Sequence, residues 1–361
     1  MIPFVIIVFI LIILFNIVFL ITRINKFNII NKIENKKIRH LVILIPIIIA
    51  IIFCFIDLFN TIVVILHLVL FWIIFDFIFL IIKKVTKNEY KIYLSGIISV
   101  SFTLIYLLYG VFSVYNVRKT VYNINTHKNL KELKIVQITD SHLGTTFDGN
   151  GFKKYCNEIN KINPDIIVIT GDYVDDSTNK KDMIIATKAL GKIKTKYGIY
   201  FVYGNHDKGY FNYRDFNNDE LRKELTKNNI TILEDESILV NDEFYIVGRQ
   251  DKTETTRKKA KELTKDLDKN KYIIMLDHQP NDYKNEMNNA DLVLSGHTHG
   301  GQLIPIGQVG VKFGFNDKTY GLEKRGNTNF IVSSGISDWA LKFKTGTISE
   351  YVIININSNV N

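Results

Sequence analysis

Four long apolar runs fill the first third of the chain and limit what it can fold into. Residues 2–22 form the first run, and three more follow at about 41–56, 61–82 and 93–115. About 20 consecutive apolar residues can cross a bilayer as a helix, which satisfies every backbone hydrogen bond internally. The sequence therefore predicts a region of four transmembrane helices, of which the second is short and contains Pro46. The first run lacks a basic n-region and a small-residue cleavage site, so it does not resemble a signal peptide.

The positive charge lies mainly in the same third. Residues 1–119 contain 12 Lys and Arg and 4 Asp and Glu, whereas the other residues contain 33 and 32, so they are nearly neutral and give no nucleic-acid signal. The loops 23–40 and 83–92 are basic, and the positive-inside rule places them in the cytoplasm. We therefore expect a multi-pass cell-membrane protein in which everything after residue 115 is extracytoplasmic.

Two other features of this third carry little functional information. His67 and Asp76 in the third apolar run favour hydrogen bonding between helices or an interfacial position, although polar groups at membrane depth can also mark a functional site. The chain has two cysteines, Cys54 and Cys156, and they are not spaced as a metal or redox motif. Two cysteines are also too few for a disulfide framework.

After residue 130 the pattern changes to short β-rich runs that alternate with amphipathic helical spacing around 152–162, 183–193 and 260–267. This alternation predicts a layered α/β domain. We place the domain boundary so that 1–119 is the membrane region and 120–361 the soluble domain. The tail adds strands in NFIVSSG and SEYVIININ. Six earlier runs are predicted to be buried strands, namely 133–140, 165–172, 198–207, 243–251, 272–278 and 291–297.

The ends of five predicted strands carry carboxylate, imidazole or amide side chains. In chain order the motifs are TDSHLG, TGDY, YGNHDKG, LDHQP and SGHTHGG, and they contain five of the eight histidines. Open α/β sheets present ligands at the carboxyl ends of their strands, and glycines there allow a close approach. Such side chains suit Mn²⁺, Fe²⁺ or Zn²⁺, and seven of them are too many for one ion but suit two ions that share a carboxylate. The seven candidate ligands are Asp140, His142, Asp172, Asn205, His278, His297 and His299.

These motifs, in this order, resemble those of the calcineurin-like metallophosphoesterase superfamily over about residues 131–356. GHTHGGQ, LDHQP and GRQD (248–251) look like its bacterial membrane-associated branch of phosphohydrolases. The resemblance implies a four-layer α/β/β/α domain that follows the membrane region. It also implies two metal sites: one held by Asp140, His142 and His299, the other by Asn205, His278 and His297, with Asp172 bridging both.

The resemblance implies a reaction as well. The histidine of GNHD faces the scissile phosphate in this family, so His206 would be catalytic without binding metal, and Asp207 would orient it. Two divalent metal ions imply hydrolysis of a phosphomonoester or phosphodiester by a metal-activated water, without a covalent intermediate. The expected membrane location favours a lipid-linked or cell-envelope substrate over a soluble one.

One segment departs from the pattern of the branch, and an alternative function stays open. At 340–351 the chain has ALKFKTGTISEY, with Lys342 where the branch usually has Arg and without the branch's prolines, which puts substrate contacts near this loop in doubt. A membrane sensor or transporter-like protein with a regulatory phosphoesterase domain, or a non-catalytic scaffold, is the alternative function.

Overall fold

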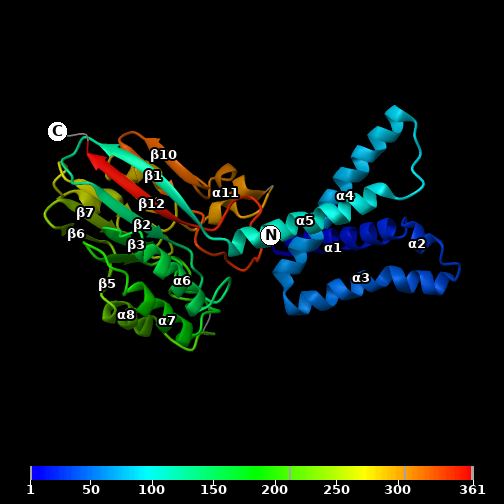
Figure 1. Cartoon of the computed structure of the whole chain (residues 1–361), viewed down its shortest axis with the longest axis horizontal. Helices are drawn as coiled ribbons and strands as arrows, with labels where there is room; N and C mark the ends of the chain where they lie inside the picture. Colours follow the sequence, from blue (N-terminus) through cyan, green and yellow to red (C-terminus); the bar gives the residue numbers. More distant parts are fainter. Residues whose placement is uncertain (1, 211–212, 305, 359–361) are drawn as a thin grey trace. The chain divides into compact units, whose positions relative to one another are not determined.

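The computed structural model describes residues 2–210, 213–304 and 306–358 (Figure 1). The chain forms two compact units, Met1–Gly110 and Val111–Asn361. The contact boundary lies earlier than the predicted boundary at 119/120, because the last turn of helix α5 (Leu94–Tyr115) belongs to the second unit. In that unit Ser349 N donates to Ser113 O over 3.2 Å.

The first unit is helical. Its helices are α1 (Ile2–Ile24), α2 (Asn28–Asn31), α3 (Lys36–Ile56), α4 (Leu58–Thr86) and the main part of α5. Among the described residues, α3, α4 and α5 are long and apolar enough to cross a membrane, and Leu11–Ile24 of α1 is a shorter apolar helix. Their exposed surface consists largely of Ile, Leu and Phe, as expected of helices that face lipid. The predicted four-helix region is confirmed.

Asp76 on α4 links three helices of this unit. Its carboxylate pairs with Arg23 Nε of α1 at 2.7 Å, accepts from Ser95 Oγ of α5 at 2.6 Å and from Tyr93 OH at 3.0 Å. His67 instead bonds within its own helix, with Nδ1 2.7 Å from Val63 O. The hydrogen bonding between helices expected of Asp76 is therefore present, and His67 takes no part in it.

The second unit contains two six-stranded sheets, which we call sheet A and sheet B. Sheet A has the order β1 (Arg118–Thr126), β12 (Glu350–Ser358), β2 (Leu133–Ile138), β3 (Ile166–Thr170), β4 (Ile199–Val202) and β5 (Ile230–Ile232). Sheet B has the order β10 (Gly321–Arg325), β11 (Thr328–Val332), β9 (Leu292–Ser295), β8 (Tyr272–Leu276), β7 (Phe244–Gly248) and β6 (Glu236–Val240).

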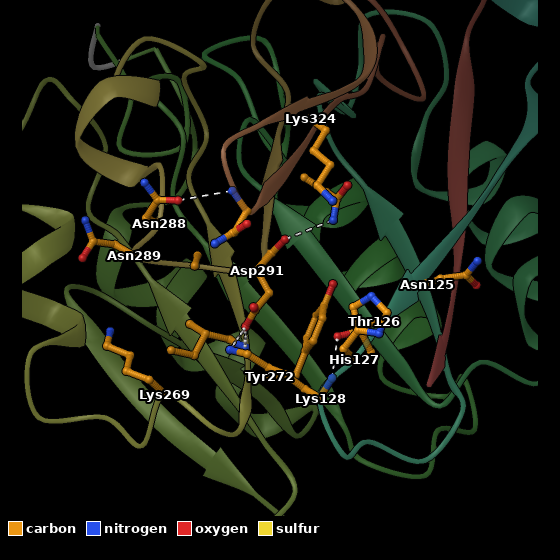
Figure 2. A pocket seen from close by; sticks show the side chains of 14 residues that line it. Asn125, Thr126, His127, Lys128, Lys269, Tyr272, Asn288, Asn289, Asp291 and Lys324 are labelled. Atoms are coloured by element: carbon orange, nitrogen blue, oxygen red, sulfur yellow. Dashed lines mark hydrogen bonds and ion pairs between the residues drawn. The ribbon is translucent and has the colours of Figure 1, made fainter. Parts of the chain in front are cut away.

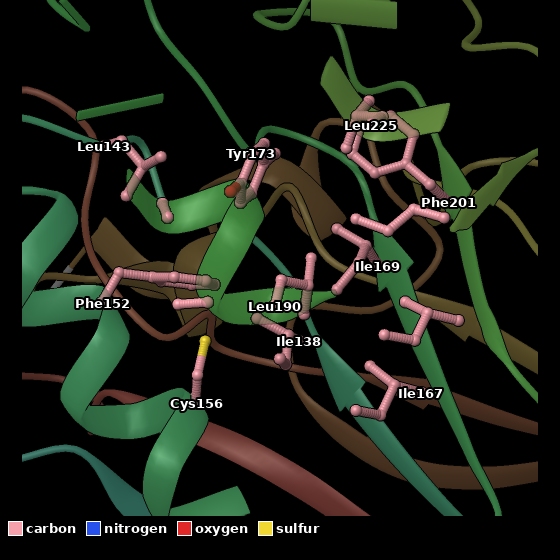
Figure 3. Packing of buried hydrophobic residues seen from close by; sticks show 14 of the residues in the cluster. Ile138, Leu143, Phe152, Cys156, Ile167, Ile169, Tyr173, Leu190, Phe201 and Leu225 are labelled. Atoms are coloured by element: carbon pink, nitrogen blue, oxygen red, sulfur yellow. The ribbon is translucent and has the colours of Figure 1, made fainter. Parts of the chain in front are cut away.

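Helices cover the outer face of each sheet, so the unit has four layers. The parallel strands are buried on both faces, which explains their nearly continuous apolar sequences. One core joins sheet A to α6 (Gly149–Asn160), α7 (Lys180–Leu190) and α8 (Asn218–Lys227), and Figure 3 shows Phe152 and Cys156 in it. A second core fills the space between the sheets, and a third joins sheet B to α9 (Ala260–Thr264) and α10 (Tyr283–Glu286). The predicted α/β/β/α architecture is confirmed.

The six strands predicted before residue 300 and both tail strands are present. Several details differ from the prediction, and strands β5, β6 and β10 and helix α8 were not predicted. Helix α9 ends at Thr264, so Leu267 of the predicted helical spacing lies beyond it. Strand β1 was not predicted, because its mostly exposed residues alternate between polar and apolar and its partner β12 lies 230 residues away. Figure 1 shows these two strands side by side.

The strand register places several chain segments at one edge of sheet A. Strands β2, β3 and β4 run parallel, so their carboxyl ends meet there. Strand β12 is antiparallel to β2, and β1 is parallel to β12, with Arg118 opposite Glu350. Both β12 and β1 therefore begin at the edge where β2 ends. The chain leaves α5 at this same edge of the second unit.

Candidate metal centre

The structure brings the seven predicted ligands together at this edge. Asp140 and His142 follow β2, Asp172 follows β3, and Asn205 follows β4 of sheet A. His278 follows β8 of sheet B, and the loop after β9 carries His297 and His299. Strand ends from both sheets thus supply the cluster, as the sequence pattern predicted.

The first group consists of Asp140, His142 and His299, whose candidate ligand atoms all lie within 4.8 Å of one another. His299 Nε2 is 3.8 Å from Asp140 Oδ1, and the rings of His142 and His299 are 5.1 Å apart. The backbone N–H of His297 donates to Asp140 Oδ1 over 3.0 Å, which fixes the carboxylate against the β9 loop.

The second group consists of Asp172, His278 and His297, again within 4.8 Å. His278 Nε2 lies 3.1 Å from Asp172 Oδ2 and 3.1 Å from Asn205 Oδ1. His278 Nδ1 faces the carbonyl oxygen of Thr170 at 2.8 Å, so it carries the proton and leaves Nε2 as the ligand atom. Asp172 Oδ2 is also 3.5 Å from His142 Nε2, so this carboxylate contacts both groups.

The chemistry of the cluster fits divalent metal ions. His142 is fully buried, and its Nε2 has no hydrogen-bond partner among the described residues. The lone pair of this nitrogen is one that a metal ion would satisfy. Burial and the neighbouring His278 lower the pKa of His297 to about 4, so this imidazole is neutral at pH 7. The pKa values of His142 and His278 are raised despite their burial, because Asp175 and Asp172 lie beside them. Burial opposes ionisation of Asp172, but the imidazoles of His278 and His142 hold its pKa well below the usual value. Asp172 is therefore an anion.

Two glycines let the strand ends approach closely. A Cβ on Gly204 would lie 2.3 Å from Asp172 Oδ1, and a Cβ on Gly296 would lie 2.3 Å from Asp140 Oδ2. Both distances are far below van der Waals contact, so any side chain there would push a carboxylate out of place. The packing of the cluster thus explains Gly204 of GNHD and the first glycine of SGHTHGG, Gly296.

His206 lies beside the cluster, and its partner differs from the predicted one. Its Nδ1 is 3.1 Å from Asp175 Oδ1, while the other oxygen of Asp175 is 3.0 Å from His142 Nδ1. Burial alone would raise the pKa of Asp175, but hydrogen bonds from these two histidines lower it well below the usual range. Asp175 thus orients both imidazoles.

Asp207 was predicted to orient His206, but the structure places it elsewhere. Its fully buried carboxylate accepts backbone N–H groups, over 2.7 to 3.0 Å, from Gly204, Asp172, Tyr173 and Val174. It therefore ties the loop after β3 to the loop after β4. The predicted partner of His206 was therefore wrong. Asp175 contacts the ring of His206, and Asp207 holds the backbone of the two loops.

A buried lysine and aspartate support His299 from behind. Asp338 Oδ1 lies 3.4 Å from His299 Nδ1 and 3.2 Å from Lys344 Nζ, and both charged residues are fully buried. Lys344 Nζ also donates to Ser334 O over 2.8 Å and to Ser337 O over 3.1 Å. Sequence reasoning missed this pair, although Lys344 lies in the segment where the chain departs from its branch.

The GRQD motif supports the loop that carries His278. Arg249 is buried, and its Nη1 donates to Asp277 Oδ2 over 2.9 Å and to Glu286 Oε1 over 2.8 Å. Asp251 accepts from Gln279 Nε2 at 3.0 Å. Both neighbours of His278 in the chain are therefore held by this motif.

A separate polar pocket of about 440 Å³ lies at the opposite ends of the strands (Figure 2). It is lined by residues at the start of β8 and β9 and the end of β1, including Tyr272, Asp291 and Thr126. None of the predicted site residues lines it. His127, which lines this pocket, is therefore distinct from the histidines of the cluster.

Carboxylates and imidazoles gathered at strand ends, in an α/β domain that follows a membrane region, define a membrane-anchored metal-binding domain. Residues 133–301 match the family model of the calcineurin-like phosphoesterases. The chain is 34% identical over 295 residues to an uncharacterised metallophosphoesterase of Campylobacter jejuni, which covers 78% of this chain and 76% of that protein. It is 29% identical over 261 residues to another of Aquifex aeolicus, across 70% of this chain and 97% of that protein.

The chain therefore belongs to the calcineurin-like metallophosphoesterase family, whose members bind divalent metals. It is also 29% identical over 195 residues to a transmembrane protein with metallophosphoesterase domain of Danio rerio, across 50% of this chain and 43% of that protein. Among its own described residues, this chain has three helices that are long and apolar enough to cross a membrane.

Proposed function

We propose that this protein is a dinuclear metal-dependent phosphoesterase that hydrolyses a phosphomonoester or phosphodiester. The observation that carries the proposal is the position of Asp172, whose Oδ2 lies 3.1 Å from His278 Nε2 and 3.5 Å from His142 Nε2. One carboxylate thus joins two groups of ligands. Asp140, His142 and His299 would hold one ion, Asn205, His278 and His297 the other, and Asp172 both. This mixed oxygen and nitrogen ligand set suits Mn²⁺, Fe²⁺ or Zn²⁺.

Two such ions would lower the pKa of water and neutralise phosphoryl charge during in-line displacement. The protein adds His206 and Asp175. Because Asp175 engages Nδ1 of His206, Nε2 is the nitrogen left to donate a proton to the leaving oxygen. Asp175 keeps the ring in that orientation.

The test is hydrolysis of bis-p-nitrophenyl phosphate by the purified full chain in detergent, after chelation and after addition of Mn²⁺, Fe²⁺, Zn²⁺ or Mg²⁺. We expect metal-dependent activity that Asp172→Asn reduces to background, because the shared carboxylate is lost. Asp266→Asn is the matched control, since its side chain is 85% exposed. A folded protein that binds no metal and stays inactive with every ion would favour the sensor or scaffold alternative.

We propose further that the domain is extracytoplasmic and that its substrate is a lipid-linked or cell-envelope phosphoester. The basic loops 23–40 and 83–92 support this orientation, and the membrane helices support this substrate class. Protease added to intact cells should cleave the domain. Protection of the domain from the protease would contradict the extracytoplasmic orientation. Hydrolysis of nucleotides far faster than of any lipid phosphate would overturn the substrate class.

A further inference from the structure

A group of large apolar side chains is exposed on the second unit. It comprises residues of the segment 304–315, which contains η2 (Ile306–Gln308) and α11 (Val309–Lys312), and one residue of a neighbouring loop. Phe313 and Phe315 are 72% and 66% exposed, and their rings stack with centroids 6.3 Å apart. We call the group the apolar lip, and its members are Ile304, Val309, Phe313, Phe315 and Trp339.

The apolar lip adjoins the candidate metal centre. Its main segment follows directly after η1 (His299–Gly301), which carries a candidate ligand. Thr298 Oγ1 in the ligand loop donates to Thr319 O over 2.6 Å, which ties the two ends of the segment together. The ring of Trp339 lies 5.4 Å from that of His206. The lip therefore borders the side of the centre where the proposed proton donor lies.

The apolar lip is also tied to the place where the chain leaves α5. Ile304 N donates to Thr345 Oγ1 over 3.2 Å. A few residues further along the same loop, Ser349 bonds to Ser113 O in the last turn of α5 and to Arg118 N at the start of β1. Only Asn116 and Val117 separate α5 from β1. One short loop thus connects the lip with the end of an apolar, membrane-length helix.

We propose that the apolar lip inserts into the interfacial layer of the bilayer in which this chain's own helices lie. Large apolar and aromatic side chains flanked by lysines are typical of segments that lie in that layer, and Lys312 and Lys342 are the exposed lysines here. A bilayer is the favoured occupant because the same edge of the unit receives the chain from α5. Exposed Phe313 and Phe315 lose their unfavourable contact with water on insertion.

A functional consequence follows, and it rests on the proposed phosphoesterase activity. With the lip inserted, the metal centre opens beside the lipid headgroups. A phosphoester in a headgroup reaches His206 without leaving the bilayer, whereas a soluble phosphoester gains nothing from the lip.

The first test measures insertion independently of catalysis. The chain has two tryptophans, so Trp72→Phe with Trp339→Phe gives a background without tryptophan, into which Phe313→Trp is introduced. The full chain is placed in nanodiscs of phosphatidylcholine with or without dibrominated acyl chains. We expect bromine to quench the fluorescence at position 313 by about half. Leu239→Trp is the control, because Leu239 is partly exposed on β6 near the opposite end of the strands, and it should not be quenched.

Equal fluorescence at position 313 with both lipids would overturn the proposal. Cross-linking at this position between two copies, without quenching, would also overturn it and would identify a second copy of the chain as the occupant. Quenching at position 313, together with no activity of the unsubstituted protein, would keep the insertion and reject only the phosphoesterase activity, so the two proposals fail separately.

The second test joins insertion to activity. Phe313→Asp with Phe315→Asp places charges on exposed positions, so folding is retained. In the Trp72→Phe protein, bromine should quench the fluorescence of Trp339. The two aspartates should abolish that quenching. Hydrolysis of a lipid phosphoester embedded in the nanodisc should fall at least about tenfold, while hydrolysis of bis-p-nitrophenyl phosphate should stay within about twofold. An equal fall for both substrates would contradict a role of the lip in lipid access.

Discussion

The two sheets of the second unit bring different chemistry to their shared edge. Sheet A supplies the carboxylates Asp140 and Asp172, whereas the candidate ligands of sheet B are all imidazoles. Each group of ligands nevertheless mixes the sheets. His299 of sheet B completes the group around Asp140, and His278 of sheet B completes the group around Asp172.

Neither sheet therefore holds a complete metal site by itself. The distances between ligands depend on how the two sheets pack, and a continuous apolar core between the sheets sets that packing. The comparison teaches that the centre forms only when the two sheets pack together. Substitutions in sheet A and in sheet B should therefore show what each ligand group contributes.

The largest effect is expected from removing a histidine of sheet B. His278→Ala and His299→Ala each take one imidazole from a different group, so each protein should retain about one divalent ion per chain instead of two. Hydrolysis should fall to background in both, because the proposed reaction would need both ions. Elemental analysis of the purified proteins measures the ions, and His127→Ala, far from the cluster, is the control. Loss of both ions from either variant would show that the two ligand groups do not bind their ions independently.

A smaller effect is expected from residues of sheet A that hold no metal. His206→Ala should lower kcat by about 10²–10⁴-fold, the range for loss of a general acid, with metal content unchanged. Asp175→Asn should lower kcat less, because the imidazole of His206 remains, although the contacts that orient His206 and His142 are weakened. Steady-state kinetics with elemental analysis distinguishes these cases. Wild-type turnover of His206→Ala would remove this residue from the mechanism.

The smallest effect is expected from the support behind His299. Lys344→Met removes the cation that holds Asp338, and Asp338 faces His299 Nδ1 at 3.4 Å. Metal affinity should fall about 10–100-fold, as for other residues that orient a ligand. Titration of the metal-free protein with Mn²⁺ measures it, and Lys342→Met, two residues away and exposed, is the control. An equal loss in both variants would contradict a specific role of Lys344.

Local pattern predicted most of the fold and the ligands. Each ligand directly follows a strand that is apolar enough to recognise, so its position could be predicted without knowledge of the tertiary structure. Asp175 was missed because an aspartate three residues after Asp172 looks like any loop residue, although the GDYVDD spacing could have indicated it. Asp338 and Lys344 could not be found, since their contact with His299 depends on a loop that folds back from about 40 residues away.

The pairing of β1 with β12 has a consequence for biosynthesis. Strand β1 is the first strand made after the apolar helices, yet its neighbour in sheet A, β12, is made about 230 residues later. At about 5–20 residues per second, β1 has to wait roughly 10–50 s with its backbone unpaired. The residues of β1 are mostly exposed and alternate between polar and apolar, which limits aggregation of the unpaired strand during that wait. Completion of sheet A thus becomes the closing step of assembly, and a ribosome that stalls before β12 would leave a membrane-bound product with an open sheet edge.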